Sequence, residues 1–349
     1  MADGMAMRLA QIGKAAKGPT PLLSFLAGPH ADAVAACWPA PHDRFFALPA
    51  ARRHAAVVLL AQGAEDLGAL ARIVERHKDA DIANRLMAGR DVPPGLMKAM
   101  ARMGETQWRL DDYALFLDLF GDAQASPVLR HMAEIRPEQL ALIGALPAGL
   151  RDAKVVAMVP NLGAARDLGL AFNLAGRIQG TGEGRRLAAR WSRAKDTQKL
   201  LAMAVEDLEP QRFVRPPEVP VLPAVFEPVT SRKQLGAIAL EFQNCLRDFA
   251  YDLAMGRMAV FAWRVEPAIA LALRWDAAGW RLAEAEQAAN ELAEEAQLRE
   301  LVQILAKVGI RAGPGLGTLV RRLNSHANGH VEHVGESFVD RLELGELWD

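Results

Sequence analysis

Three apolar segments separated by short turns constrain the fold of this chain more than any other feature. Met258–Trp263 and Ala268–Trp275 are almost continuous apolar runs, which is typical of buried β-strands. Asp276 to Gly279 has the composition of a tight turn, and a third strand, Trp280–Glu284, is predicted after it. Strands joined by so short a turn pair antiparallel, so this part of the chain predicts a small antiparallel sheet.

Helical patterns stand on both sides of these strands. Ser231 is placed to cap a first helix, and Leu246–Leu253 carries apolar residues three or four apart. After the strands, Glu291–Val308 has the periodicity of an amphipathic helix. Residues 231–312 are therefore predicted to form a small α+β domain.

The chain before this domain has only helical patterns. Short amphipathic segments with Pro at several starts and Gly at several ends predict an all-helical domain over residues 21–209. Within it, Pro21–Pro49 is expected to be compact but irregular, and Gly184–Leu208 to be the longest helix. No residue signature recurs at a fixed period, which argues against a regular repeat array. The predicted fold class is mainly α, with a helical N-terminal domain plus the small α+β domain and its short antiparallel sheet.

Five prolines from Pro216 to Pro228 separate the two predicted domains. Such density prevents a helix or a central strand, so residues 210–230 are predicted to be an extended connector. Its apolar residues, including Val219 and Leu222, indicate that it lies along a surface groove.

The two ends of the chain are expected to be tails. Residues 1–20 are polar and are predicted to be flexible. Residues 313–349 follow a Gly-rich break and are predicted to be a C-terminal tail, with one further turn of helix in Thr318–Leu323.

Composition indicates a cytoplasmic protein but no catalytic class. The 349 residues are 51% hydrophobic and 24% charged, which is enough apolar content for a substantial core. The formal net charge of -1 argues against an extreme polyanion binder, although local basic patches can survive a neutral total. Two cysteines, Cys37 and Cys245, form no disulfide framework, and no segment resembles a membrane span or a secretory signal. No cofactor is predicted.

The order of features in the predicted α+β domain resembles the PcfJ-like proteins, which occur on conjugative plasmids and other mobile elements. Cys245 stands where that family has a Cys at a helix start, and Phe249 or Tyr251 stands at the place of its aromatic residue. Gly256 precedes the first strand, as in the family, and the three strands and Asn290 continue the order. The resemblance covers about a quarter of the chain and implies a fold more directly than a reaction.

The chain also departs from the family pattern. Relatives often have His directly before the Cys, whereas this chain has Asn244. Where relatives tend to have Gln and Gly near the end, this chain has Glu284 and Gln287. If the family uses a His–Cys pair for chemistry, the pair is incomplete in this chain.

Cys245 and two carboxylates are the candidates for catalysis. A thiolate near a helix start is stabilised by the helix dipole and becomes nucleophilic. The simpler interpretation of Cys245 is a small buried apolar residue between helix and sheet. Glu284 and Glu286 stand two apart on one strand, so their side chains share a face, and a carboxyl with raised pKa could act there as general acid or base. The alternative is the wet face of an antiparallel sheet.

Two sets of side chains are candidates for binding. Asn244, Tyr251, Gln287 and Asn290 are the polar residues expected near the catalytic candidates. The basic set consists of Arg186, Arg190 and Arg193. These arginines share a helix face and could contact nucleic-acid phosphates, whereas the alternative is a solvated face with local ion pairs.

Two further patterns carry no site prediction. His326, His330 and His333 lack the fixed spacing and partners of a metal site, so no metal is predicted. The glycines from Gly176 to Gly184 are interpreted as a loop, because the Gly-Lys-Ser/Thr ending of a phosphate-binding loop is absent.

The leading hypothesis is an accessory protein of a mobile genetic element that binds nucleic acid or a protein partner. One alternative is a cysteine-dependent enzyme that uses Cys245 with Glu284 or Glu286, for which faster thiol labelling of Cys245 than of Cys37 is expected. The other alternative is a non-catalytic helical scaffold.

Overall fold

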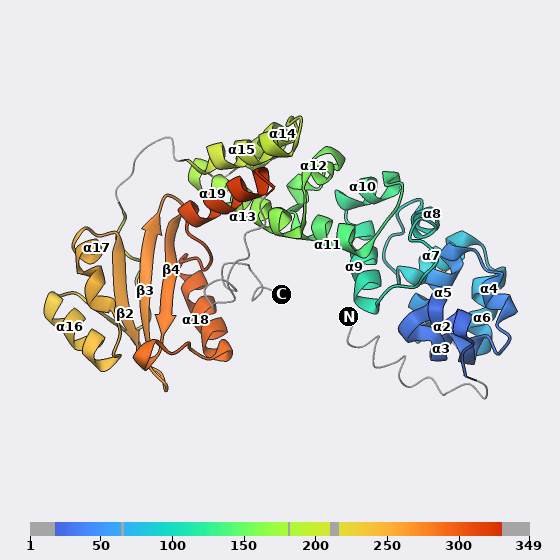
Figure 1. The fold of residues 1–349 in the computed structure, drawn as a ribbon, viewed down its shortest axis with the longest axis horizontal. Helices are drawn as coiled ribbons and strands as arrows, with labels where there is room; N and C mark the ends of the chain where they lie inside the picture. The colour runs from blue at the N-terminus through green and yellow to red at the C-terminus, as the bar shows by residue number, and fades with distance from the viewer. Residues whose placement is uncertain (1–17, 64–65, 181, 210–215, 330–349) are drawn as a thin grey trace. The chain divides into compact units, whose positions relative to one another are not determined.

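The computed structural model describes residues 18–63, 66–180, 182–209 and 216–329. The chain is mainly α-helical with a small antiparallel sheet, as predicted (Figure 1). The sheet has four strands and not three, because Phe226–Pro228 of the predicted connector pairs with the first predicted strand as an edge strand. The chain divides into two compact units, Met1–Ala165 and Arg166–Asp349. This division differs from the predicted domain boundary at residues 210–230, because the helices after residue 165 group with the sheet.

The first unit is built from short helices. Their bounds are α2 (Pro21–Ala27), η1 (Gly28–His30), α3 (Ala31–Cys37), α4 (Asp43–Phe46), α5 (Ala50–Gln62), α6 (Leu67–Arg76), α7 (Asp79–Leu86), α8 (Leu96–Met100), α9 (Leu110–Gly121), α10 (Ala125–His131), α11 (Pro137–Ala145), η2 (Ala148–Leu150) and α12 (Ala153–Met158). The prediction that residues 21–49 are irregular is wrong. Pro21 stands in the first turn of α2 and Pro49 just before α5, where a missing N–H is tolerated.

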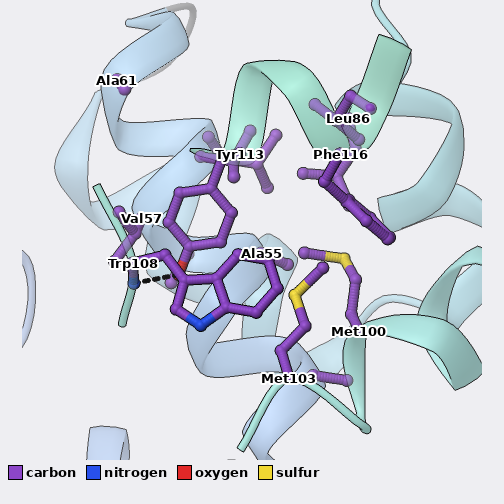
Figure 2. Packing of buried hydrophobic residues seen from close by; sticks show 14 of the residues in the cluster. Ala55, Val57, Ala61, Leu86, Met100, Met103, Trp108, Tyr113 and Phe116 are labelled. Carbon is purple, nitrogen blue, oxygen red and sulfur yellow. Dashed lines mark hydrogen bonds between the residues drawn. The ribbon is translucent and has the colours of Figure 1, made fainter. Parts of the chain in front are cut away.

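Aromatic rings and methionines fill the core of the first unit. Trp108 and Tyr113 stack with ring centroids 5.8 Å apart, and Met100, Met103 and Phe116 lie around them (Figure 2). The Tyr113 hydroxyl is fully buried and accepts a hydrogen bond from the backbone N–H of Trp108 at 3.1 Å. The core is therefore ordered by a polar contact as well as by apolar packing.

The second unit combines a helical group with an α+β layer. The helical group contains α13 (Leu162–Gln179), α14 (Gly184–Trp191), α15 (Thr197–Leu208) and α19 (Leu316–Ala327). The α+β layer contains β1 (Phe226–Pro228), α16 (Arg232–Glu241), η3 (Leu246–Phe249), α17 (Ala250–Ala254), β2 (Met258–Trp263), β3 (Ile269–Asp276), β4 (Gly279–Glu286), η4 (Ala288–Asn290) and α18 (Glu295–Lys307).

The sheet lies between two helical covers. Its strands follow the order β1-β2-β3-β4, and every neighbouring pair is antiparallel. α16, η3 and α17 cover one face, where they pack on Val260, Ala262, Ala270 and Ala272 (Figure 1). α18 covers the other face and packs on a cluster that includes Trp280. The predicted sheet and its two flanking helical segments are thus present.

A bulge in β4 decides which way its acidic residues point. The register places Ala272 opposite Glu284 but Leu273 opposite Leu282, so Ala283 is an extra residue. Leu282 belongs to the cluster under α18, and without the bulge Glu284 would share its face. The bulge instead turns Glu284 and Glu286 toward the α16 face of the sheet.

The helices α13 to α15 and α19 correct three predictions. Gly176 belongs to α13, an 18-residue helix that was not predicted. The predicted helix over 184–208 is broken between Trp191 and Thr197, because the Asp196 side chain accepts from Lys199 N at 2.7 Å and caps α15. Residues 316–327 form the helix α19 and not a tail.

α19 completes the helical group although it follows the sheet in sequence. It packs against α15, and its Arg322 side chain donates to the Asp167 carboxylate of α13 at 2.6 Å. His326 Nε2 lies 2.9 Å from the other Asp167 oxygen. The α+β layer is therefore inserted, in sequence, between two parts of one helical group. Figure 1 shows α19 beside α13 and α15.

Candidate functional site

Two loops that carry predicted site residues meet at one end of the sheet. The turn after α16 runs from Phe242 to Cys245, and the loop after β4 includes Ala289. The backbone N–H of Ala289 donates to the Phe242 carbonyl at 2.7 Å. The structure thus brings the segment of Asn244 and Cys245 next to that of Asn290.

Both loops contain residues in the left-handed backbone region. Gln243 has φ 49°, Ala289 φ 60° and Asn290 φ 58°. Residues other than glycine adopt this region at a cost of about 1–3 kcal/mol each, and such residues cluster at functional sites. Asn tolerates it better than Ala or Gln. The strained residues therefore make this corner of the domain a candidate site.

Glu284 and Glu286 stand beside the loops on the α16 face of the sheet. Burial raises the pKa of Glu284, the neighbouring Glu286 raises it further, and Arg274 and Arg281 oppose that shift. Burial alone raises the pKa of Glu286. Both carboxyls are half-buried, so they differ from the fully solvated charges expected on a wet sheet face. The raised pKa values make each of these carboxyls hold a proton more readily than an ordinary glutamate does.

Cys245 does not have the surroundings of an activated nucleophile. Its side chain is exposed, so the interpretation as a buried apolar residue is wrong. The helix that follows it is the four-residue η3, which is too short to supply a substantial dipole. In the part of the chain that the structure describes, no hydrogen-bond partner of the Cys245 thiol is found, whereas an activated thiol needs a base within about 3.2 Å.

The other cysteine makes the labelling test less informative. The Cys37 thiol is buried, donates to the Leu67 carbonyl at 3.1 Å, and has its pKa raised to about 12 by burial first and by Glu75 second. Cys245 is therefore expected to react faster than Cys37 through exposure alone. A catalytic role for Cys245 needs a different test.

The remaining polar candidates have separate positions. Asn244 Oδ1 accepts from Leu246 N at 3.3 Å, so this side chain stabilises its own turn. Gln287 Nε2 donates to Gln297 Oε1 of α18 at 3.0 Å, away from the α16 face. Tyr251 on α17 is 71% exposed. Only Asn290 combines exposure with a place in a strained loop.

Exposed apolar side chains form a feature that the sequence did not indicate. Leu240 occupies an apolar position of its helix, but it is 72% exposed. Tyr251 lies on α17 and Met255 directly follows this helix, so the two residues are four apart. Both side chains are exposed. We use the name outer apolar surface for these three exposed side chains, which are Leu240 on α16 and Tyr251 and Met255 on and after α17. They lie on the helical layer that covers the α16 face of the sheet.

The predicted arginine face is largely neutralised by acidic side chains. Arg186 pairs with Glu183, and Arg190 pairs with Asp207. Asp207 Oδ2 also accepts from the indole N–H of Trp191 at 2.8 Å, so Arg190 belongs to a partly buried network that joins α14 to α15. Arg193 is exposed. This arrangement fits the alternative of a helix face with local ion pairs.

Of the three histidines noted in the sequence, His326 lies among the described residues. His330 and His333 lie outside the described residues, and His326 contacts Asp167. Among the residues that are described, no group of three His, Cys, Asp or Glu side chains is arranged to hold a metal ion. None of the helices in the same ranges combines the length and the apolar character that a membrane span requires.

Comparisons with known proteins add no relative. No protein-family model matches the chain, and no curated protein and no solved structure matches it.

Proposed function

We propose that the chain is a PcfJ-like accessory protein of a mobile genetic element and that its α+β layer binds a protein partner. The order helix, Cys, three antiparallel strands and Asn-containing loop supports the kinship. The outer apolar surface supports the kind of partner, and it is the observation on which the proposal rests.

Covering large exposed apolar side chains with another molecule is favourable, because it removes their surface from water. Leu240, Tyr251 and Met255 are each about half exposed or more. Tyr and Met are enriched in protein interfaces, since both bury large area and adapt to a partner. A protein with an apolar surface of its own would remove these side chains from water.

Nucleic acid is a weaker candidate because two of the three candidate arginines already have acidic partners. A phosphate would have to displace Glu183 from Arg186 and Asp207 from Arg190. Replacing Arg190 would also disturb the Asp207 network, so loss of binding in such a variant would be ambiguous. Arg193 and Arg185 are exposed, and their replacement by Glu is the cleaner test of phosphate contacts.

The experiment compares the full chain with the double variant Tyr251→Glu/Met255→Glu. Each protein is immobilised and exposed to nuclease-treated extract of cells that carry the gene. We expect a protein retained by the native chain and not by the variant, and this protein, once purified, should bind the variant at least about tenfold more weakly.

A second double variant, Arg185→Glu/Arg193→Glu, serves as the control and should bind the purified partner normally. Equal binding of the partner to native and Tyr251/Met255 variant chains would exclude the outer apolar surface. A gel shift of DNA or RNA that the arginine control abolishes would favour nucleic acid instead.

The half-buried Glu284 favours an enzyme as a second candidate. A carboxyl with raised pKa close to Glu286 is suited to proton transfer. If it activates Cys245, the rate of Cys245 alkylation should depend on pH with a step that Glu284→Gln removes. An alkylation rate with the pH dependence of a simple exposed thiol, unchanged in Glu284→Gln, would exclude this enzyme.

A further inference from the structure

The proline tract before β1 is restricted to one backbone conformation. Pro216, Pro217, Pro220 and Pro223 have φ fixed near the polyproline value. The residues that precede prolines are confined to extended or polyproline conformations, which adds Val219 and Leu222. The segment has no helix or strand hydrogen bonding. Residues 216–223 are therefore expected to form a left-handed polyproline helix with three residues per turn, which ends where Phe226 N–H donates to the Pro223 carbonyl at 2.9 Å and closes a turn.

Burial along the tract repeats every third residue, as that helix requires. One row, Pro216, Val219 and Leu222, is partly buried. Val219 and Leu222 pack against the apolar cluster between the sheet and α18. The Trp280 indole N–H donates to the Pro217 carbonyl at 3.3 Å. The tract is therefore held on its own domain by one row of side chains and one hydrogen bond.

The other two rows point away from the sheet. Pro217, Pro220 and Pro223 form one of them, with the two outer prolines exposed and the middle one partly exposed. Glu218 and Val221 form the other, and both are exposed. Val221 is 89% exposed, which is unusual for an apolar side chain in an ordered segment.

We propose that the outward rows of this proline tract are a docking ligand for a second protein, whose groove is lined by aromatic side chains and carries a cation opposite Glu218. Aromatic grooves accept prolines spaced three apart, because the rings pack on the flat pyrrolidine faces. The Pro217 carbonyl accepts from the Trp280 indole N–H, and the Pro223 carbonyl accepts from Phe226 N–H. A polyproline helix makes no internal hydrogen bonds, so the carbonyls between these two prolines remain able to accept from Trp or Tyr donors of the partner.

The attachment of the tract to the sheet strengthens its suitability as a ligand. The backbone of a free proline-rich peptide already has little conformational freedom. Here the packed row of Pro216, Val219 and Leu222 reduces that freedom further before a partner binds. Little conformational entropy remains to be lost on binding. The row of Pro216, Val219 and Leu222 packs on the domain and fixes the orientation of the two outward rows. Both outward rows can therefore enter one groove.

This surface is independent of the outer apolar surface proposed above. The tract packs on the α18 side of the sheet, whereas Leu240, Tyr251 and Met255 belong to helices on the opposite side. Substitutions in one surface should leave the other intact. Either proposal can therefore fail without the other.

The test measures binding of the full chain to purified SH3, WW and EVH1 domains, which represent the known aromatic proline-binding grooves. We expect saturable binding to at least one domain. Val221→Asp should weaken it at least about tenfold, because a charge replaces an apolar contact. Glu218→Lys should weaken it in a salt-dependent way, since it opposes the cation of the groove.

Val225→Asp is the matched control, because Val225 is also exposed but lies beyond the third turn of the tract. It should bind as the native chain does. The triple variant Pro217→Ala/Pro220→Ala/Pro223→Ala should lose binding as well. Hydrogen exchange of β3 in every variant reports whether the sheet is intact. Binding to none of the domains, or equal binding by the Val221→Asp and native chains, would overturn the proposal.

Discussion

Ala289 holds the loop after β4 in a strained backbone conformation. Its φ of 60° lies where the Cβ of an L-residue meets the following carbonyl oxygen. Glycine has no such penalty, although it loses more entropy on folding. We predict that Ala289→Gly stabilises the chain by about 0.5–1 kcal/mol in urea unfolding.

Ala288→Gly is the control for that substitution. Ala288 lies next to Ala289 in η4 but is not among the residues with positive φ. Its replacement should be neutral or destabilising through chain entropy alone. Stabilisation by both substitutions, or by neither, would show that the φ of Ala289 does not strain the loop.

His54 is a buried polar residue of the first unit, and its burial disfavours the protonated imidazole. Its Nδ1 lies 2.6 Å from the Tyr113 hydroxyl, and its Nε2 lies 3.1 Å from the Gly104 carbonyl. The Tyr113 hydroxyl already accepts from Trp108 N–H, so it donates to Nδ1, and Nε2 carries the proton that Gly104 accepts. The imidazole is therefore neutral in the native first unit.

We predict that the first unit loses stability as the pH falls from about 6.5 to about 4. Burial lowers the pKa of His54 from 6.5 to about 4, so between these values the unfolded chain binds more protons than the folded one. The stabilisation is complete above pH 6.5 and amounts to roughly 3 kcal/mol. Hydrogen exchange of α9 as a function of pH measures it. His54→Gln should reduce the slope, and an unchanged slope would contradict the assignment.

Single residues also show how far the sequence predicts the candidate site. The strand period predicted that Glu284 and Glu286 share a face, and they do. It did not predict which face, because that depends on the bulge at Ala283, and no local pattern distinguishes a bulge from a regular strand. The exposure of Leu240 was equally hidden, because apolar periodicity cannot tell a core contact from an interface.

At the scale of elements, α13 was missed because its sequence is poor in helix-forming signals. Gly163, Gly169 and Gly176 each weaken an isolated helix by about 1 kcal/mol relative to Ala. Packing of a buried face that includes Ala164 and Leu168 outweighs this deficit. The usable signal was Asn161, whose side chain accepts from Ala164 N at 2.8 Å and caps the helix.

The buried ion pair between α13 and α19 should decide whether α19 stays in place. The Arg322 and Asp167 side chains are 5% and 6% exposed, so removing Arg322 leaves the Asp167 carboxylate buried with His326 but without the guanidinium that balances its charge. We predict that Arg322→Ala destabilises the helical group by about 3–5 kcal/mol. Hydrogen exchange should show loss of protection in residues 316–327 while β3 remains protected.

The exposed pair Arg299–Glu295 of α18 provides a control of the same chemistry. Both side chains are more than half exposed, so Arg299→Ala should cost at most about 0.5 kcal/mol. Equal effects of the two substitutions would mean that burial of the Asp167 carboxylate does not matter for α19.

At the scale of the whole molecule, the second unit is continuous in space but not in sequence order. α13 to α15 precede the α+β layer, and α19 follows it. The Asp276 carboxylate links the layer to α19, because it pairs with Arg311 and accepts from Leu316 N at 3.4 Å. A proline-rich boundary in the sequence therefore marks where the chain enters the layer, and not where the helical group is complete.

This arrangement predicts that a fragment of residues 1–209, which contains the tail and the helical domain that the sequence predicts over residues 21–209, cannot keep all its helices. The fragment lacks α19, so the face of α15 that packs on it, together with the buried Asp167 of α13, becomes exposed to water. Burial of a Leu side chain contributes about 1.5–3 kcal/mol, and a short helix without such burial is marginal. Hydrogen exchange of α15 should be much faster in the fragment than in the full chain.

Exchange of α9 in the first unit should be equal in the fragment and the full chain and serves as the control. Full protection of α15 in the fragment would show that α13 to α15 are stable without α19.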